Sequence, residues 1–238
     1  MKAVILAGGR GTRLAPYTTV LPKPLVPVGG LPILETVLRQ LRHHGFDDVT
    51  LAVGYLSSLI RAYLDQNPLS SQMTLRYHHE REPLGTAGAL ATIEGLDEPF
   101  LAMNGDLLTT VSYSDMMRFH KARGAALTIA VTERRVQLEV GVLGLAADDA
   151  IVSYTEKPVQ SYPSSMGIYI CSPSVRDFMQ PGAALDIPAL VIKLIDAGEK
   201  VCGFRTGALW LDIGNPADHE RASEAFERDR KIYLPDEA

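Results

Sequence analysis

Near the start of the chain, glycines, arginines and a lysine occur at spacings that suit phosphate chemistry. The apolar run 2–7 leads into the stretch GGRGTRL at 8–14, and Pro-Lys-Pro follows at 22–24. Glycines let the backbone approach a phosphate closely and point its amide groups at the oxygens. Arg13 can hold two phosphate oxygens at once, and Lys23, between two prolines, places a point charge on a stiff backbone. These residues predict a site for a phosphate-rich ligand.

The glycine-rich stretch matches neither of the two commonest nucleotide-binding motifs. A dinucleotide-binding Gly-x-Gly-x-x-Gly pattern would need a third glycine where Leu14 stands, and a fitting acidic residue after the second predicted strand is missing. A Walker loop would need a lysine where Thr12 follows Gly11. The stretch is therefore expected to bind phosphates in another way.

Strands and helices alternate through the first half of the chain. This alternation predicts an α/β fold with a single Rossmann-like sheet, mixed but mostly parallel and flanked by helices. Ligands of such sheets bind beyond the carboxyl ends of the strands, so the glycine stretch and the turn 104–106 should share one rim. We expect strands over 2–7, 49–53, 73–78 and 100–103, and helices over 33–44, 57–66 and 85–94.

The second half is more mixed in pattern. No repeat, linker or composition shift divides it from the first, so one domain over 1–238 is predicted, ending in a loosely held tail at 231–238. We expect helices over 114–123, 174–179, 187–197 and 216–230, and strands over 127–131, 141–145, 151–155, 166–171 and 201–205.

Composition limits the classes of partner. The 238 residues are 46% hydrophobic and 21% charged, with a formal net charge of -5, so no basic field favours nucleic acid. Cys171 and Cys202 are far apart and in no metal spacing, which predicts reduced thiols in a reducing compartment. No signal peptide and no apolar stretch of about 20 residues is present, so we expect a cytoplasmic protein without a membrane partner.

Six motifs, in order, resemble those of the sugar-1-phosphate nucleotidyltransferases, also called nucleotide-sugar pyrophosphorylases. The resemblance runs from Lys2 to about Ala225, and the short length is similar to the compact members without a C-terminal β-helix. It implies a nucleotide-binding half at 1–110 and a sugar-phosphate-binding half at 111–230 of the nucleotide-diphospho-sugar transferase fold. The motifs are LAGGRGTRLAPYTTVLPKP, EPLGTAGAL (82–90), NGD (104–106), EKP (156–158), GIY (167–169) and WLDIGNP (210–216).

The resemblance implies three catalytic residues and a metal site. Arg13 would stabilise the departing pyrophosphate, and Lys23 would contact the α-phosphate, where negative charge develops. Asp106 and Asp212 would hold Mg²⁺, which prefers hard oxygen ligands. Because it would hold the metal ion, Asp106 is the third implied catalytic residue. The implied nucleotide-binding residues are Leu6, Ala7, Gly8, Gly9, Gly11, Thr12, Arg13, Gly85, Thr86, Gly88 and Asn104.

For the sugar phosphate, the resemblance implies contacts from the second half of the chain. Lys157 would bind the phosphate and hold it in line, and Glu156 would accept hydrogen bonds from sugar hydroxyls. Asp186 stands near the family's sugar pocket, although a helix cap explains it equally well. Many family members have a Tyr-Gly pair where this chain has Val140 and Gly141, so its sugar contacts at this position need not be those of the family. The implied substrate-binding residues are Gly141, Glu156, Lys157, Gly167 and Asp186.

The implied reaction transfers a nucleoside monophosphate from a triphosphate to a sugar-1-phosphate and releases pyrophosphate. Gly85-Thr86-Ala87-Gly88 is more similar to guanylyltransferases acting on mannose- or heptose-1-phosphate than to thymidylyltransferases, which favours GTP. CTP, UTP or dTTP as donor stays open, as does a catalytically silent relative that binds nucleotide sugars. Because family members are often dimers or tetramers, a homo-oligomer is a further open expectation.

Overall fold

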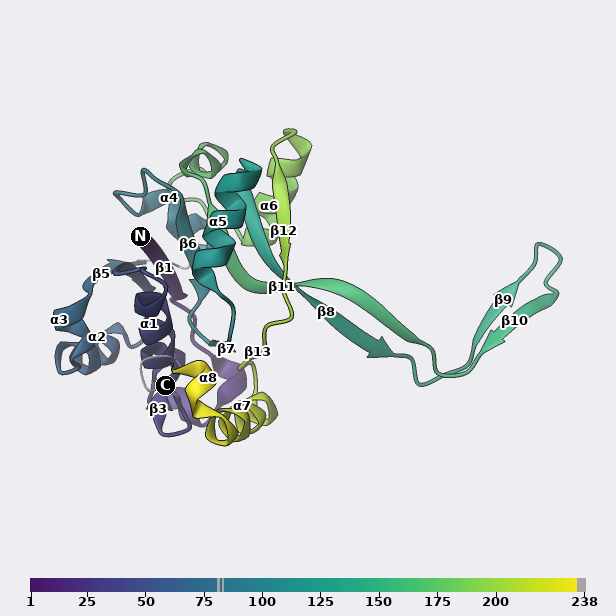
Figure 1. Ribbon diagram of the computed structural model, residues 1–238, viewed down its shortest axis with the longest axis horizontal. Coiled ribbons are helices and arrows are strands. Elements are labelled where there is room, and N and C mark those ends of the chain that lie inside the picture. Colours follow the sequence, from purple (N-terminus) through teal and green to yellow (C-terminus); the bar gives the residue numbers. More distant parts are fainter. Residues whose placement is uncertain (81, 83, 235–238) are drawn as a thin grey trace.

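A seven-stranded sheet runs through the body of the molecule (Figure 1). The computed structural model describes residues 1–80, 82 and 84–234. Four strands on one side are mutually parallel, β11 is antiparallel to both its neighbours, and β12 is parallel to β8. The predicted α/β class is confirmed. The strand order is β12 (Val201–Arg205), β8 (Leu127–Gln137), β11 (Val159–Cys171), β6 (Phe100–Asn104), β1 (Lys2–Ala7), β4 (Asp48–Val53) and β5 (Thr74–His79).

Helices cover both faces of this sheet, and the alternation of side chains along β1 shows why. Val4 belongs to one hydrophobic core with α4 and α6, whereas Ile5 belongs to another with α1, α2 and α5. Successive strand residues point to opposite faces, so a continuous apolar run supplies both cores. The helices are α1 (Ile33–His43), α2 (Ser57–Asp65), α3 (Leu69–Gln72), α4 (Gly85–Thr92), α5 (Tyr113–Arg123) and α6 (Ile187–Asp196). The helix expected at 174–179 is a 3₁₀ helix, Pro173–Phe178.

The C-terminal helices α7 (Pro216–Arg228) and α8 (Arg230–Tyr233) form a third core with the segment after β1. Tyr233 is 2% exposed and Leu234 is fully buried. The expectation of a loose tail was therefore wrong for 231–234, because these two apolar side chains pack beside Phe226. Positions 235–238 of that predicted tail lie outside the described residues.

Two short antiparallel pairs complete the body. β2 (Pro27–Val28) pairs with β3 (Leu31–Pro32), and β7 (Leu107–Thr109) pairs with β13 (Trp210–Asp212). In the second pair Asp212 lies opposite Leu107, so it lies next to the turn that carries Asp106. Through this pair, residues more than a hundred positions apart in the sequence come together.

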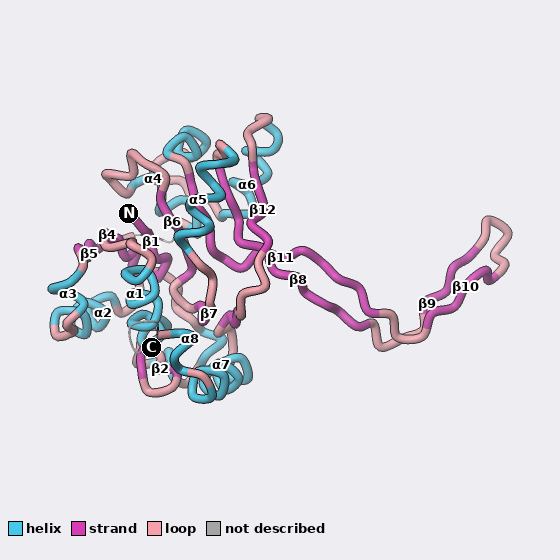
Figure 2. Tube along the Cα trace, in the orientation of Figure 1, coloured by secondary structure: helices cyan, strands magenta, loops and turns pink. Residues whose placement is uncertain are grey.

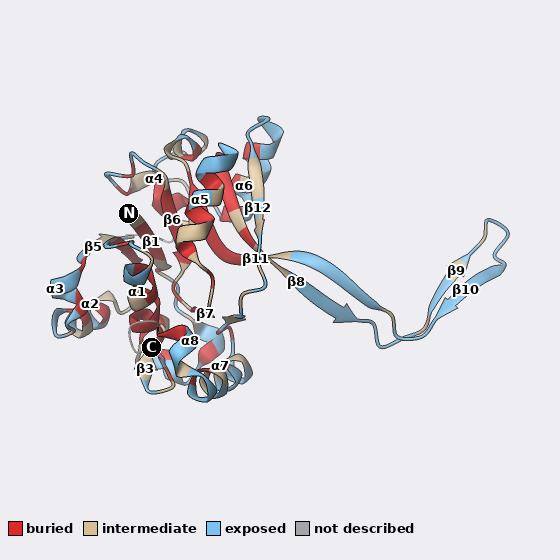
Figure 3. Cartoon of the chain, in the orientation of Figure 1, coloured by how far each residue is buried: buried red, intermediate tan, exposed pale blue. Residues whose placement is uncertain are grey.

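A long arm, defined here as residues 133–165, projects from the body (Figures 1 and 2). β8 and β11 continue outward as a two-stranded ribbon, and the hairpin of β9 (Val142–Leu145) and β10 (Ile151–Thr155) forms its far end. None of the arm residues is buried (Figure 3). The strands predicted at 127–131 and 166–171 thus extend much farther than expected.

Within the described ranges, no helix is both long and apolar enough to span a bilayer.

Candidate active site

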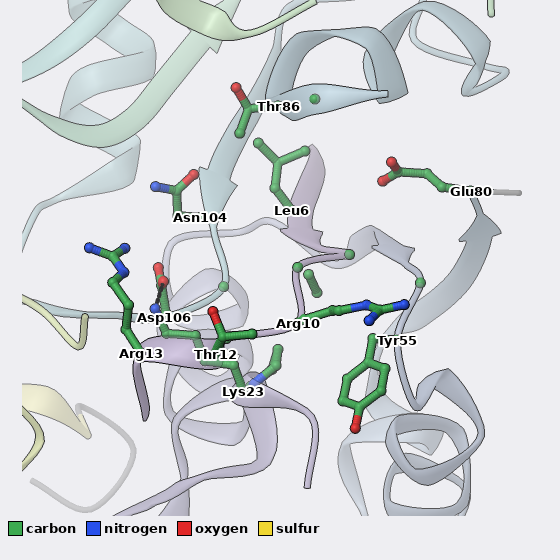
Figure 4. A pocket seen from close by; sticks show the side chains of 18 of the residues that line it. Leu6, Arg10, Thr12, Arg13, Lys23, Tyr55, Glu80, Thr86, Asn104 and Asp106 are labelled. Atoms are coloured by element: carbon green, nitrogen blue, oxygen red, sulfur yellow. Dashed lines mark hydrogen bonds and ion pairs between the residues drawn. The ribbon is translucent and has the colours of Figure 1, made fainter. Parts of the chain in front are cut away.

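A cleft of about 830 Å³ opens at the carboxyl ends of β1, β4, β5 and β6 (Figure 4). This is the rim on which a parallel sheet is expected to bind its ligand. The cleft brings together most of the residues that the sequence singled out. Those that line it are Leu6, Ala7, Gly8, Gly9, Gly11, Thr12, Arg13, Lys23, Gly85, Thr86, Asn104, Asp106 and Asp186.

The glycine-rich loop between β1 and the first 3₁₀ helix (Thr12–Leu14) has a fixed shape. Gly11 adopts a φ of 63°, and a Cβ there would lie 3.0 Å from Thr18 Cγ2 and 3.1 Å from Lys23 Cβ. The Gly11 carbonyl accepts hydrogen bonds from Thr18 Oγ1 at 2.8 Å and from the Leu14 amide at 2.9 Å. Leu14 is fully buried, which explains why this position holds an apolar anchor instead of a third glycine.

Lys23 and Asp106 form an ion pair on the floor of the cleft. Lys23 begins a 3₁₀ turn, and the Pro24 and Leu25 that follow it are buried, so its backbone is held against the body. Its Nζ donates to Asp106 Oδ2, while the other carboxylate oxygen, Oδ1, is buried without a hydrogen-bond partner. A buried oxygen that accepts nothing is costly, so this atom fits a cation that arrives with the ligand.

Asp212 lies next to this pair, across the β7–β13 ladder. Loss of hydration raises the pKa of Asp212, and the negative charge of Asp106 raises it further, whereas Lys23 and Arg13 lower it. Two neighbouring carboxylates beside an arginine and a lysine suit a shared divalent cation. No group of three or more His, Cys, Asp or Glu side chains with metal-site geometry occurs in the part of the chain that the structure describes. Phosphate oxygens and water would supply the remaining ligands.

On the other side of the cleft, the start of α4 meets the start of α6. Asp186 Oδ1 accepts from the Thr86 amide at 3.1 Å, and Thr86 Oγ1 accepts from the Ile187 amide at 2.9 Å. Asp186 therefore lies beside the predicted base-binding segment and does not cap its own helix through its side chain. Gly88 does not line the cleft, because its amide donates to the Leu185 carbonyl at 2.9 Å.

Sequence reasoning missed several lining residues. Tyr55 comes soon after β4, and Glu80 directly follows β5, so the rule that placed Asp106 on the rim could have found both. Arg10 lies with its guanidinium carbon 5.9 Å from the centre of the Tyr55 ring. The lining residues absent from the predicted site are Arg10, Pro24, Gly54, Tyr55, Glu80 and Gly105.

Three of the predicted sugar-phosphate residues lie on the arm, away from the cleft. Glu156 Oε2 accepts from the Tyr154 hydroxyl at 2.6 Å, and Lys157 Nζ lies 3.2 Å from Glu139 Oε2. A Cβ on Gly141 would lie 2.3 Å from the same Tyr154 hydroxyl. We call these five residues, 139, 141, 154, 156 and 157, the elbow cluster. Their predicted role in binding the sugar phosphate stays a prediction.

Gly167, the remaining predicted sugar contact, lies where the arm joins the body. Its φ is 72°, and a Cβ there would lie 2.8 Å from Nδ2 of Asn104, a lining residue. The β8–β11 ladder changes register between Ser165 and Tyr169, so Gly167 sits in an irregular stretch of β11. This position therefore borders the cleft, unlike the elbow cluster.

Similarity to known proteins agrees with this site. A family model described as "Nucleotidyl transferase" matches residues 2–229. The chain belongs to this family. Mannose-1-phosphate guanyltransferase from Schizosaccharomyces pombe is 34% identical, and mannose-1-phosphate guanyltransferase beta-B from Xenopus laevis is 36% identical. Each match covers 92% of this chain but 62% of the relative, so the chain spans about 62% of the length of these curated relatives.

Solved structures of this nucleotidyl transferase fold are also similar. HddC from Yersinia pseudotuberculosis, complexed with GMP-PN, is 27% identical, with a TM-score of 0.71 over 94% of this chain and 99% of that chain. A putative glucose-1-phosphate thymidylyltransferase from Bacillus anthracis has a TM-score of 0.75 over 96% of both chains. At 22% identity, the second structure supports the fold alone.

Proposed function

We propose that the protein transfers a nucleoside monophosphate, with GTP as the favoured donor, to a sugar-1-phosphate and releases pyrophosphate. The observation that carries this proposal is the cleft itself. A glycine-rich loop, Arg13, Lys23 and Asp106 converge on one rim, and one Asp106 oxygen is buried without a partner. Asp212 does not line the cleft but lies next to Asp106 across the β7–β13 ladder. This arrangement suits a triphosphate that arrives with a divalent cation. Family membership and the guanylyltransferase relatives support the same reaction.

The chemistry asks for positioning and charge stabilisation more than for acid–base groups. An oxygen of the sugar phosphate attacks the α-phosphorus, the bond from that phosphorus to the bridging oxygen breaks, and pyrophosphate leaves with the electron pair. No proton has to be removed, because the nucleophile is already an ionised phosphate. Arg13 would hold the phosphates that leave, and Lys23 would release Asp106 in part to contact the α-phosphate.

Mg²⁺ fits the carboxylate pair and is part of the proposal. Asp106 and Asp212 would hold the ion, which when bound would neutralise phosphate charge and orient the triphosphate. The unpartnered Asp106 Oδ1 and the position of Asp212 beside it both support a cation between these side chains, and the pKa of Asp212 is raised by burial and then by the charge of Asp106. Within this pair, Lys23 offers a competing positive charge when no cation is present.

Glu80 supports guanine as the base. Its carboxylate faces Gly8 at the lip of the cleft, and Oε2 accepts from the Leu84 amide at 3.2 Å, close to the start of α4. An ionised carboxylate can only accept hydrogen bonds, and the N1–H and N2 amino groups of guanine are donors. The guanylyltransferase relatives and the GMP-PN complex of HddC agree with this choice. We expect Glu80→Gln to reduce the preference for GTP over the other triphosphates.

The test is pyrophosphate release with Mg²⁺ across a panel of four triphosphates and several sugar-1-phosphates. We expect release with GTP and at least one hexose- or heptose-1-phosphate. If the chain binds nucleotide normally but releases pyrophosphate with no pair, the alternative of a silent nucleotide-sugar-binding relative replaces the enzyme. Release with CTP, UTP or dTTP in preference to GTP would instead correct the donor.

A further inference from the structure

The arm exposes an unusual share of the apolar surface. Of the 19 large hydrophobic side chains that are exposed among the described residues, 11 lie on the arm, including Ile151, Val152 and Tyr154 at more than 60% exposure. A two-stranded ribbon is marginally stable in water on its own, and exposed apolar clusters of this kind mark interaction surfaces. The composition of this surface indicates an interaction site.

The exposed surface of the arm is large enough for a stable protein complex. Six of the eleven arm residues are more than half exposed, and they run from Val140 to Val159. Stable complexes bury about 800 Å² on each partner, or about 20–30 residues a side. The 33 residues of the arm, none of them buried, are enough for such an interface.

The arm also carries charged groups that have no partner on the body. Among the described residues, Lys157 forms its ion pair with Glu139, and Glu156 accepts from Tyr154, all within the elbow cluster. Lys157 has a φ of 44°, a conformation that non-glycine residues rarely adopt and that is retained mainly at functional sites. The elbow cluster is thus specifically shaped, and its ion pair and its hydrogen bond both join residues of the arm.

The position of the arm relative to the cleft follows from the sheet. β11 is antiparallel to both β6 and β8, so β8 runs in the same direction as β1 and β6 and leaves the body at the same rim as the cleft. At the root, the Trp210 indole N–H donates to the Met166 carbonyl at 2.8 Å, two residues from Asp212. The arm therefore starts beside the carboxylates of the cleft and points away from the body (Figure 1).

The elbow cluster cannot reach the cleft of its own chain in this conformation. Regular pairing continues from Ser164↔Thr132 to Val159↔Gln137, which makes the inner part of the arm a stiff ribbon. Lys157, just beyond this ladder, is nine residues from Met166 at the root of the arm, or about 30 Å along the ribbon at roughly 3.3 Å per residue. A lysine side chain does not span this distance, and folding back would break the ladder.

We infer that the arm is exchanged between two copies of this chain, so that Glu156 and Lys157 of one copy complete the sugar-phosphate side of the other copy's cleft. This inference rests on the proposed function for the role of Lys157. A twofold arrangement lets each arm, leaving at the rim, lie across the partner's rim in return. The receiving rim has exposed apolar residues of its own, Tyr17, Val20 and Leu209, which follow the glycine-rich loop or precede β13.

Two impaired variants test the exchange directly, assayed at a sugar-1-phosphate concentration well below the wild-type KM. Arg13→Ala disables the cleft and keeps the arm, whereas Lys157→Ala disables the arm and keeps the cleft. The two variants are co-expressed with different tags, and the mixed dimer is isolated on both tags. With exchanged arms, the mixed dimer has one intact site of two and recovers about half of the wild-type rate of pyrophosphate release. If each arm serves its own chain, every site has a defect and the mixed dimer is no more active than the parents, which overturns the inference.

A second experiment separates the arm from the chemistry. By light scattering we expect the wild-type chain to be a dimer and the double variant Ile151→Ser/Val152→Ser at the arm tip to be a monomer. The matched control, Ile192→Ser/Ile195→Ser, removes two exposed isoleucines of 60% and 58% exposure from α6 on the body and should stay dimeric. A monomeric wild type overturns the exchange whatever its activity. A tip-sensitive dimer that releases no pyrophosphate supports the exchange and overturns the proposed function.

Discussion

The cleft and the arm grow from the same sheet but hold their charged residues in opposite ways. In the cleft, Lys23 and Asp106 are 14% and 20% exposed and stand on backbone anchored by the buried neighbours Leu25 and Leu107. On the arm, Lys157 and Glu139 are 49% and 72% exposed, and no neighbouring arm residue is buried. The core positions the first pair before any ligand arrives. The second pair needs another surface to fix it.

The largest expected effect is in the cleft. Arg13→Ala should lower the rate of pyrophosphate release about 100- to 1,000-fold, the loss typical when one preorganised charge partner of a transition state is removed. Steady-state kinetics with saturating triphosphate measures it. Arg118→Ala on the surface of α5 is the matched control and should keep the wild-type rate. A rate within threefold of wild type for Arg13→Ala would contradict its role.

The second prediction compares a buried side chain of the body with an exposed side chain of the arm. Leu38 on α1 is fully buried and Val152 on the arm is 67% exposed. Leu38→Ala should lower the free energy of unfolding by about 3 kcal/mol because it leaves a cavity. In the dilute, monomeric chain, Val152→Ala should change it by less than about 0.5 kcal/mol. Urea unfolding followed by circular dichroism compares the two. Equal losses would mean that the arm packs on its own body.

Lys157→Ala should separate the two substrates. We expect the KM for the sugar-1-phosphate to rise about ten- to thirtyfold, which corresponds to one lost charge-assisted contact, with little change in the KM for the triphosphate. Lys193→Ala, an exposed lysine on α6, is the control. An equal rise in the KM values for the sugar-1-phosphate and the triphosphate would contradict a specific role of Lys157 in binding the sugar phosphate. The cleft and the arm would then not bind different substrates.

The smallest expected effect is a dependence of stability on pH that belongs to the body alone. His120 is buried between Thr128 and Ser172, and desolvation lowers its pKa to about 4. The unfolded chain takes up this proton near pH 6.5 and the folded chain does not, so stability falls as the pH decreases from 6.5 towards 4. The loss should be about 1.5 kcal/mol between pH 6.5 and pH 5.

Thermal unfolding at several pH values measures this loss, with His120→Gln as the control that lacks the titrating ring. The arm has no histidine, so its tip variant should keep the wild-type slope. A His120→Gln variant with an unchanged slope would assign the pH dependence to other groups.

The sequence predicts the body well because local patterns decide it. The run 2–7 is buried on both faces, and Ile33 to Leu41 repeats at helical spacing, so the strand and the helix form where expected. Because parallel sheets bind ligands beyond the carboxyl ends of their strands, the glycine loop and Asp106 are then expected close together. The pairing of Asp212 with Leu107 is nonlocal, and no periodicity reveals it; only the resemblance linked Asp212 to Asp106.

For the arm, the sequence predicts the strands but not what covers their apolar side chains. Residues 141–145 and 151–155 have the alternation of strands, and these strands exist. However, nothing in an apolar residue such as Val152 says whether a core of the same chain or another molecule covers it. The pattern predicts a strand. Whether its apolar side chains reach the core of the same chain depends on how far β8 and β11 extend from the body, which the pattern does not indicate.

Leu14 has a consequence for how the protein is made. It ties the phosphate-binding loop to Ala222 and Phe226 in α7, near the other end of the chain. During synthesis, the loop leaves the ribosome some two hundred residues before its anchor exists, although domains otherwise fold as they emerge. A truncated chain that lacks α7 would therefore present the whole GGRGTRL sequence without a shaped phosphate site. The folding of α7, a late-synthesised helix, thus controls when the first motif becomes able to bind.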